Sequence, residues 1–161
     1  PPIYTLNFYN AIANGGKMMR PYVVKEIRRD GHTILKNSPE VINSSICKSS
    51  TLKKVQGMLE GVIGYGTAKA NKSDEFGIAG KTGTAQNRGK DHSAFMGFAP
   101  MDNPKIAVSV YVENGGWGAT YGVPIGALII EKYLNGKLSP QSEVKANDIQ
   151  MRRIDYGIHE R

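Results

Sequence analysis

Cysteine, tryptophan and long apolar stretches are scarce in this chain of 161 residues. The single cysteine, Cys47, excludes an internal disulfide and leaves the redox compartment open. No apolar stretch is long enough to span a bilayer, and we expect no signal peptide within these residues. Because the chain opens on Pro1-Pro2 rather than on methionine, we expect it to be an excised piece of a longer protein.

The chain also lacks the residue clusters that several kinds of active site need. With three histidines and one cysteine, it has no Cys/His cluster, so we expect no metal site and no cofactor. No pair of carboxylates is placed as in a glycosidase. Without a nearby histidine, Cys47 is better interpreted as a small core or surface residue than as a nucleophile.

Composition is that of an ordinary globular domain, with 40% apolar and 22% charged residues. The net charge of +7 raises the possibility of a nucleic-acid partner. However, the lysines and arginines are scattered, and no basic stripe with interleaved aromatic residues occurs. We therefore expect no nucleic acid, and interpret the charge as a solvated face with a diffuse attraction for anionic peptides or polymers.

The first half of the chain predicts two helices and a small hairpin. Residues 5–13 have helical spacing, and a glycine pair stops the helix after Asn14. Residues 22–27 and 32–35 predict two strands, joined by an Asp-Gly turn. Residues 37–47 are expected to form a loop. Residues 51–63 carry apolar side chains at steps of three and four, which predicts an amphipathic helix.

The second half predicts an antiparallel meander of three strands, at residues 76–86, 92–100 and 105–113. We expect Pro124 near the start of a helix that ends at Asn135-Gly136. Its apolar face is expected to consist of Ile125, Leu128, Ile129 and Tyr133.

A last, polar helix is expected to start at Ser139-Pro140, and residues 152–161 are expected to be a charged, mobile tail. The fold class is therefore α+β, with an antiparallel sheet of about three core strands and packed helices.

Residues 80–85 read Gly-Lys-Thr-Gly-Thr-Ala and form the most informative motif. A phosphate-binding loop would need an earlier glycine where Glu75 stands, and a helix after the motif. Glu75 is a carboxylate, and the residues after the motif are poor helix formers. Nucleotide binding is therefore the weaker interpretation.

The same motif fits one wall of a serine acyl-transfer site. Lys81 would supply positive charge and relay protons, and the hydroxyls of Thr82 and Thr84 would hold a substrate carboxylate. The backbone N–H of Thr84 would donate to a developing oxyanion. Gly83 would let the substrate backbone come close. A solvated lysine on a surface strand is the alternative.

The sequence that flanks the motif identifies a protein family more specifically than the motif does. It resembles the C-terminal part of the transpeptidase domain of a class B penicillin-binding protein, most like the elongation type, penicillin-binding protein 2. The resemblance covers nearly all of residues 1–135. It rests on residues 8–17 (Phe-Tyr-Asn-Ala-Ile-Ala-Asn-Gly-Gly-Lys), 66–68 (Gly-Thr-Ala), 81–86, 91–92, 95–100 (Phe-Met-Gly-Phe-Ala-Pro), 103–108 and 112–116 (Val-Glu-Asn-Gly-Gly).

This resemblance implies a partial penicillin-binding or β-lactamase-like fold, with residues 1–136 as the C-terminal portion of the transpeptidase domain and residues 137–161 as a polar helix and tail. It implies an acyl-serine enzyme that cross-links peptidoglycan stem peptides and is acylated by β-lactams. Such proteins are anchored to the bacterial inner membrane, act on its periplasmic face, and work with the cell-wall elongation machinery. A β-lactam sensor or other non-enzymatic module of the same fold is the alternative. Among enzymes, a β-lactamase is a closer alternative than a nucleotide-binding protein.

The family's nucleophile motif, Ser-x-x-Lys, and its second motif, Ser-x-Asn, are expected upstream of the third motif. No Ser-x-Asn occurs. We find two Ser-x-x-Lys matches, at residues 45–48 and 50–53, but the family's motif would lie before residue 8. We interpret both as chance matches and expect Ser50 to cap the following helix. The chain alone should be inactive.

Two further residues are candidates for the rim of the site. His92 follows the motif strand after a short turn, although a lone histidine at a strand start is more often satisfied or solvated. Trp117 lies in a glycine-rich loop and could contact substrate, or fold onto its own domain. The apolar surface of an isolated piece is also expected to favour self-association or a companion chain over residues 51–63 or the sheet.

Overall fold

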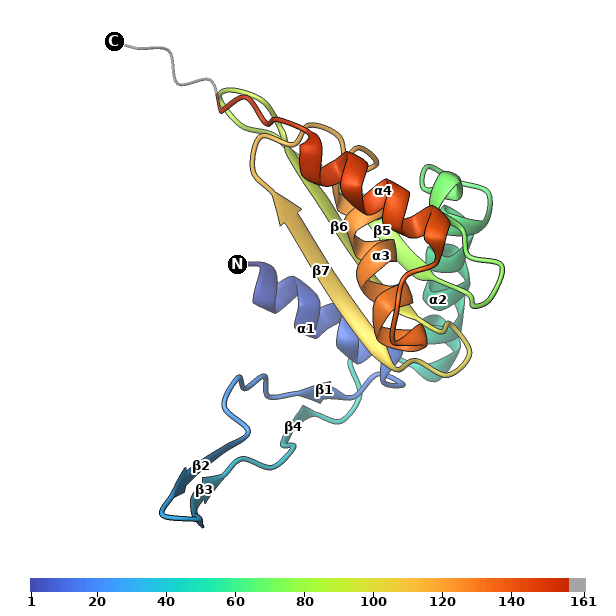
Figure 1. Cartoon of the computed structure of the whole chain (residues 1–161). Helices are drawn as coiled ribbons and strands as arrows, with labels where there is room; N and C mark the ends of the chain where they lie inside the picture. The colour runs from blue at the N-terminus through green and yellow to red at the C-terminus, as the bar shows by residue number, and fades with distance from the viewer. Residues whose placement is uncertain (157–161) are drawn as a thin grey trace.

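The computed structural model describes residues 1–156 (Figure 1). The elements follow in the order α1 (Pro2–Ala13), β1 (Met18–Met19), β2 (Glu26–Arg29), β3 (His32–Lys36), β4 (Val41–Asn43), α2 (Ser49–Gly64), the short 3-10 helix η1 (Lys69–Asn71), β5 (Ala79–Ala85), β6 (His92–Ala99), β7 (Ile106–Val112), α3 (Gly122–Asn135) and α4 (Pro140–Met151).

The predicted meander is confirmed as a three-stranded antiparallel sheet in the order β5-β6-β7. Its register places Thr82 of β5 beside Phe95 of β6, and Phe95 beside Val110 of β7. Short polar turns join the strands, as expected from the turn residues between them. The motif strand β5 is therefore an edge strand, because among the described residues it pairs only with β6.

Helices pack on both faces of this sheet and beside β5 (Figure 1). Phe95 is fully buried and belongs to a cluster with Val123 and Ile130 of α3. Phe98 lies three residues further along β6, so its side chain points to the opposite face. There it packs with Ile12 of α1, in a cluster that also holds residues of α2. Two small cores thus fix the sheet between its helices.

The bounds of α3 agree with the prediction, and Ile125 of its predicted apolar face packs against the core, but Ile129 and Tyr133 are wrong. Ile129 and Tyr133 are 44% and 61% exposed, whereas Val123, Gly126 and Ile130 are buried. Gly126 is the point of closest approach, because a side chain there would clash with the ring of Phe95. A pattern that counts only large apolar residues misses a face that is centred on a glycine.

Residues 18–43 form an extension that we call the arm, which leads away from the sheet (Figure 1). The Asp-Gly turn is confirmed, with φ values of 51° at Asp30 and 78° at Gly31. The predicted strand at 22–27 begins only at Glu26, and Val23 is 97% exposed. The expected loop at 37–47 contains β4, which pairs with β1. Two-residue pairings of this kind give no periodic signal.

The predicted helix 51–63 is confirmed, but it begins at Ser49 with Lys48 as its N-cap. The prediction that Ser50 caps it is therefore wrong. The start of α4 agrees with the prediction, and the Ser139 hydroxyl accepts a hydrogen bond from the N–H of Ser142. Of the expected mobile tail, residues 157–161 lie outside the described part, and Arg152 is held by hydrogen bonds.

Candidate active site

The motif strand presents three polar side chains at the free edge of the sheet. Lys81 and Thr84 are exposed, and Thr82 is half-buried. The Lys81 ammonium donates to the Thr82 carbonyl at 2.8 Å and lies 3.5 Å from the Thr82 hydroxyl oxygen. The structure thus brings a cation and a hydroxyl together at an edge where backbone groups are available to an extended ligand.

Thr67 joins this group, although the sequence analysis did not single it out as a site residue. Its hydroxyl oxygen lies 3.3 Å from that of Thr82. Residues 65–68 turn the chain after α2 and bring Thr67 beside the motif strand. The available signal was the Gly-Thr-Ala triplet at 66–68, which contributed only to the resemblance.

A loop of the protein covers the backbone of β5 at Gly83. The backbone of Gly118 lies so close that a side chain on Gly118 would meet the Gly83 carbonyl oxygen at 2.7 Å and the Gly83 nitrogen at 3.0 Å. A side chain on Gly83 would instead meet the Cβ of Ala94 at 3.3 Å and no atom of the loop within 4 Å. The absence of a side chain at Gly118 therefore lets the loop at residues 114–122 lie directly on β5.

Ser93 anchors that loop to β6. It is completely buried, and its hydroxyl donates to the Trp117 carbonyl at 2.8 Å while accepting from the Gly122 N–H at 2.9 Å. Ser93 is the register partner of Thr84. Side chains of directly paired residues share a face of the sheet, so Thr84 projects on the side where the loop passes. The Trp117 side chain is 75% exposed.

His92 lies at the start of β6 and is engaged by its neighbours. Its Nδ1 accepts a hydrogen bond from the Asn114 N–H at 2.9 Å, and its ring lies 5.3 Å from that of Tyr111. This bond also fixes the first residue of the loop that carries Trp117. His92 therefore has a structural role, because its Nδ1 has a hydrogen-bond partner. That His92 lies on the rim of the site stays a prediction.

A cavity of about 620 Å³ adjoins the motif strand. It lies between the start of α1 and the sheet, and Thr84, Met96, Tyr111 and Glu113 are among its lining residues. Thr84 therefore borders open space on the same strand that carries the Lys81 ammonium.

Neither Ser-x-x-Lys match before the motif strand lies near Lys81. The last turn of α2 leads into Thr67, which touches Thr82. Ser50 lies at the opposite end of this helix, about 20 Å away at roughly 1.5 Å per residue. Ser45 lies beyond it, where the N–H of Ile46 donates to the carbonyl of Gly16 at 2.9 Å. The structure separates both serines from the motif by the length of α2.

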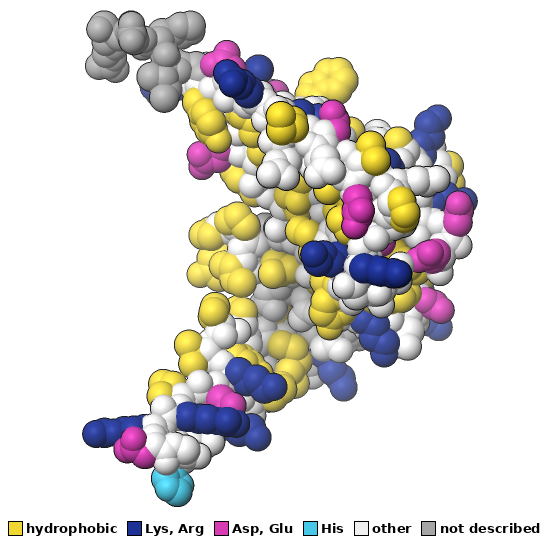
Figure 2. All heavy atoms as spheres, viewed as in Figure 1, with side chains coloured by type: hydrophobic (Ala, Val, Ile, Leu, Met, Phe, Trp, Pro, Cys, Tyr) yellow, Lys and Arg dark blue, Asp and Glu magenta, His cyan; other side chains and the backbone are white. Residues whose placement is uncertain are grey.

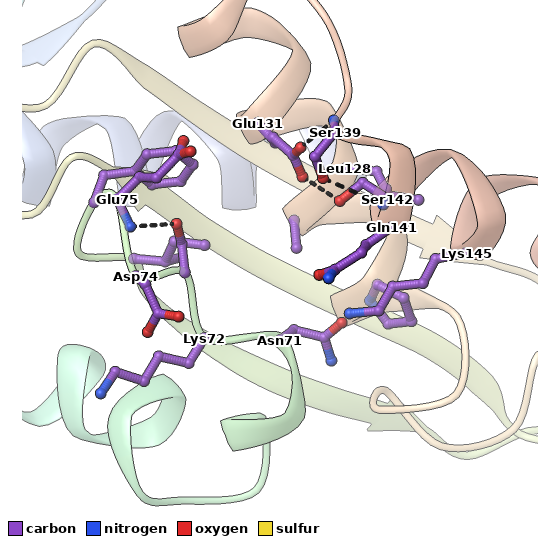
Figure 3. A pocket seen from close by; sticks show the side chains of 15 residues that line it. Asn71, Lys72, Asp74, Glu75, Leu128, Glu131, Ser139, Gln141, Ser142 and Lys145 are labelled. Atoms are coloured by element: carbon purple, nitrogen blue, oxygen red, sulfur yellow. Dashed lines mark hydrogen bonds between the residues drawn. The ribbon is translucent and has the colours of Figure 1, made fainter.

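A third Ser-x-x-Lys, at residues 142–145 on α4, was missed by the sequence analysis. It lines a second cavity of about 280 Å³ between the loop at 71–78 and helices α3 and α4 (Figure 3). None of residues 81–84 lines this cavity. The Ser142 hydroxyl donates to Glu131, whose carboxylate also accepts from the Ser139 N–H at 2.7 Å.

Glu131 is a poor general base for Ser142. Burial alone would raise the pKa of its carboxyl, but the hydrogen bonds from Ser142 and Ser139 and the charge of Lys145 outweigh that effect. The pKa therefore lies below its usual value. Such a carboxylate keeps its charge and holds its donors, so the group is an anchor for α4.

The phosphate-loop alternative does not fit this geometry. The motif lies inside β5 and is followed by β6, whereas a phosphate loop leads into a helix. Within residues 1–156, no cluster of His, Cys, Asp and Glu could hold a metal ion. No helix in that range combines the length and hydropathy that crossing a bilayer requires.

Comparisons with known proteins find similarity over most of the chain. The model of the penicillin-binding protein transpeptidase domain matches residues 2–134. Stage V sporulation protein D of Bacillus subtilis is 30% identical over 94% of the chain, and the peptidoglycan D,D-transpeptidase PbpA of Mycobacterium tuberculosis is 32% identical over 84%. The chain spans only 25% and 30% of these two relatives.

A solved structure shows the same fold. Penicillin-binding protein A of M. tuberculosis, in its imipenem acyl-enzyme complex, has a TM-score of 0.74 and 31% identity to the chain. The match covers 83% of this chain and 30% of that one.

Proposed function

The chain belongs to the transpeptidase domain family of class B penicillin-binding proteins, and we propose that it forms one wall of the active site of an elongation-type peptidoglycan D,D-transpeptidase. The observation that carries this proposal is the free edge of β5, where the Lys81 ammonium meets the Thr82 hydroxyl next to Thr84. The rest of the site, including the nucleophilic serine, would come from another part of a longer protein.

The residues of β5 have distinct roles in this proposal. Lys81 supplies positive charge for the substrate carboxylate and relays protons during acyl transfer. The hydroxyls of Thr82 and Thr84 hold the carboxylate, and the Thr84 N–H donates to the oxyanion. In antiparallel strands the direction of the backbone groups repeats every second residue. Thr84 therefore presents its N–H on the side where the Thr82 carbonyl meets Lys81.

The reaction proceeds through an acyl-serine intermediate. The serine oxygen bonds to the carbonyl carbon of a stem peptide, and the terminal residue leaves with a proton. The amine of a second stem peptide then attacks the ester, which forms the cross-link and breaks the ester bond, and the amine gives up a proton to the serine oxygen. A β-lactam would enter the same site through its carboxylate and carbonyl and would acylate the same serine, and the M. tuberculosis relative is known as an acyl-enzyme complex with imipenem.

The remaining roles follow from the same assignment. His92 and Trp117 lie on the rim of the site, and Gly83 keeps the strand narrow enough for close approach. Residues 1–136 are the C-terminal portion of the transpeptidase domain, and residues 137–161 are an appended helix and tail. The whole protein would act at the periplasmic face of the inner membrane, together with the elongation machinery.

Exposed apolar side chains support a further proposal, that this chain alone self-associates. Ile3, Tyr4 and Phe8 of α1 are 44%, 70% and 49% exposed. Hydrophobic side chains gather on the side of the view that holds α1 and the arm (Figure 2). Sedimentation analysis should show dimers, together with binding of a hydrophobic dye. A monomer that binds no dye would contradict this.

Acylation by a labelled penicillin tests the main proposal. In the longer protein, Lys81→Ala should lower the second-order acylation rate constant by about 100-fold, the usual size of proton-transfer effects. Lys105→Ala removes an exposed lysine just before β7 and should leave the rate unchanged. An undiminished rate in Lys81→Ala would refute the role of Lys81. Turnover of a stem-peptide substrate distinguishes the enzyme from a β-lactam sensor.

A further inference from the structure

Helix α4 has little apolar contact with the rest of the protein. None of its residues is buried, and Val144 and Met151 are 69% and 81% exposed. Only Ser142, Ala146 and Ile149 of the helix are half-buried, so specific polar contacts must help to hold it in place. In α4 those contacts lie at its two ends.

The first end is attached to α3. Glu131 of α3 accepts hydrogen bonds from the Ser139 N–H and the Ser142 hydroxyl (Figure 3). The cavity between α4 and the loop at 71–78 begins next to this anchor.

The second end is attached to the loop at 114–122 through Arg152. The Arg152 guanidinium donates twice to Asp148 on α4, at 2.6 and 3.1 Å, and once to the carbonyl of Thr120, at 3.0 Å. The same group lies over the ring of Tyr121, 5.6 Å from its centre. One planar side chain thus joins the end of α4 to two successive residues of the loop.

That loop is the one that lies on the motif strand. Two residues before Thr120, the backbone of Gly118 presses on Gly83. One residue earlier, the Trp117 carbonyl is bonded to Ser93, the register partner of Thr84. Arg152 therefore holds the outer side of a loop whose inner side touches the strand with Lys81 and Thr84.

We propose that Arg152 is a positioning residue and that α4 is a strap which holds the Trp117 loop against the motif strand. Arg152 does not touch the reacting atoms. It fixes the height of the loop above Gly83, and with it the shape of the site beside Thr84. Its effect on acylation rests on the proposed transpeptidase function, whereas its effect on the loop does not.

The loop effect can be measured in this chain directly, because Trp117 is its only tryptophan. Arg152→Ala should lower the fluorescence anisotropy of Trp117 and speed amide exchange at Gly122 and Val123, whose N–H groups bond to Ser93 and Gly118. Arg153→Ala is the matched control, because neighbouring Arg153 has no ion pair with the described residues. Equal anisotropy and equal exchange rates in Arg152→Ala and Arg153→Ala would overturn the proposal that α4 holds the loop.

Arg152→Lys keeps the charge but loses the planar fork, so its anisotropy should fall between wild type and Arg152→Ala. Raised salt should shift wild type toward Arg152→Ala, because the Arg152 and Asp148 side chains are 38% and 62% exposed. Circular dichroism would show whether each variant is folded. For a variant that does not fold, Asp148→Asn serves instead, because it removes the carboxylate that orients Arg152 and should also loosen the loop.

Acylation by a labelled penicillin then tests the functional part in the longer protein. Arg152→Ala should lower the acylation rate constant by about tenfold, as expected when a site is slightly misplaced, and Arg153→Ala should not. A loosened loop with an unchanged acylation rate would overturn the positioning role. Loss of acylation in Arg152→Ala but not in Lys81→Ala would instead count against the proposed function of Lys81.

Discussion

The sheet and the arm are built on opposite physical principles. In β6, six of eight residues are buried, and a single ring, Phe95, reaches Gly126 of α3, Gly80 of β5 and Gly97 of its own strand. In the arm, every residue of β3 and β4 is exposed. The arm keeps its path through backbone pairing, the bond from the Asn37 amide to the carbonyl of Val24, and the exposed Arg20–Glu40 pair.

This difference shows where the candidate site gets its rigidity. The motif strand is paired with the most buried strand of the sheet, so its shape is fixed by side chains that make no contact with substrate. A two-stranded ribbon without a core is marginally stable by itself, so the arm can open without disturbing the sheet. Chemistry that needs fixed geometry fits β5 and does not fit the arm.

The largest effect on the free energy of unfolding is expected from truncating Phe95, the ring that joins the sheet to α3. Phe95→Ala should reduce the free energy of unfolding by about 3–5 kcal/mol, because it removes apolar contacts and leaves a cavity. Val23→Ala in the arm should change it by less than about 0.5 kcal/mol. Urea denaturation of both variants makes the comparison, and similar losses would show that the arm is part of the core.

A smaller loss in the free energy of unfolding is expected from replacing Ser93, which joins the sheet to the loop. Ser93→Ala should cost about 1–3 kcal/mol, because the Trp117 carbonyl and the Gly122 N–H lose their buried partner. Ser109→Ala removes a half-buried hydroxyl from β7 and should cost less. Equal values for the two serines would contradict an anchoring role for Ser93.

The smallest effect on global stability is expected at the base of the arm. The hydrogen bond from Arg20 holds the pKa of the Glu40 carboxyl below its ordinary value of 4.5. The pair therefore stabilises the arm fully above that value, and this contribution is lost as the pH falls through the lowered pKa.

Glu40→Gln should accordingly speed exchange of the Arg20 amide, which bonds to the Glu40 carbonyl, at neutral pH. Its urea midpoint should stay close to that of the wild type. Glu60→Gln removes an exposed carboxylate from α2 and is the control. A large fall in the midpoint for Glu40→Gln alone would show that the arm and the sheet unfold together.

Parts of this fold follow from sequence because a strong local signal exists. Alternating valines predict β7, and the Asp-Gly pair predicts the hairpin turn with its positive φ values. The packing face of α3 did not follow, because Gly126 carries no hydrophobic side chain to count. The short β1–β4 pairing did not follow either, since its strands are too short for periodicity.

The candidate site divides in the same way. Lys81, Thr82 and Thr84 lie within four consecutive residues, so one motif and its flanking sequence could identify them. Thr67 comes from a loop, Gly118 acts through its backbone, and Arg152 acts through side-chain bonds to a distant carbonyl, none of which residue types encode. The third Ser-x-x-Lys shows the converse: residues 142–145 carry the pattern, and only the engagement of Ser142 by Glu131 identifies it as an anchor.

The most direct test is to map the acylated residue. The central claim is that this chain supplies the Lys81 wall, while the nucleophilic serine lies outside residues 1–161. After treatment of the longer protein with a labelled penicillin, peptide mass spectrometry should find the adduct on a serine outside those residues. The isolated chain should remain unlabelled. A stoichiometric adduct on Ser45, Ser50 or Ser142 would contradict the account.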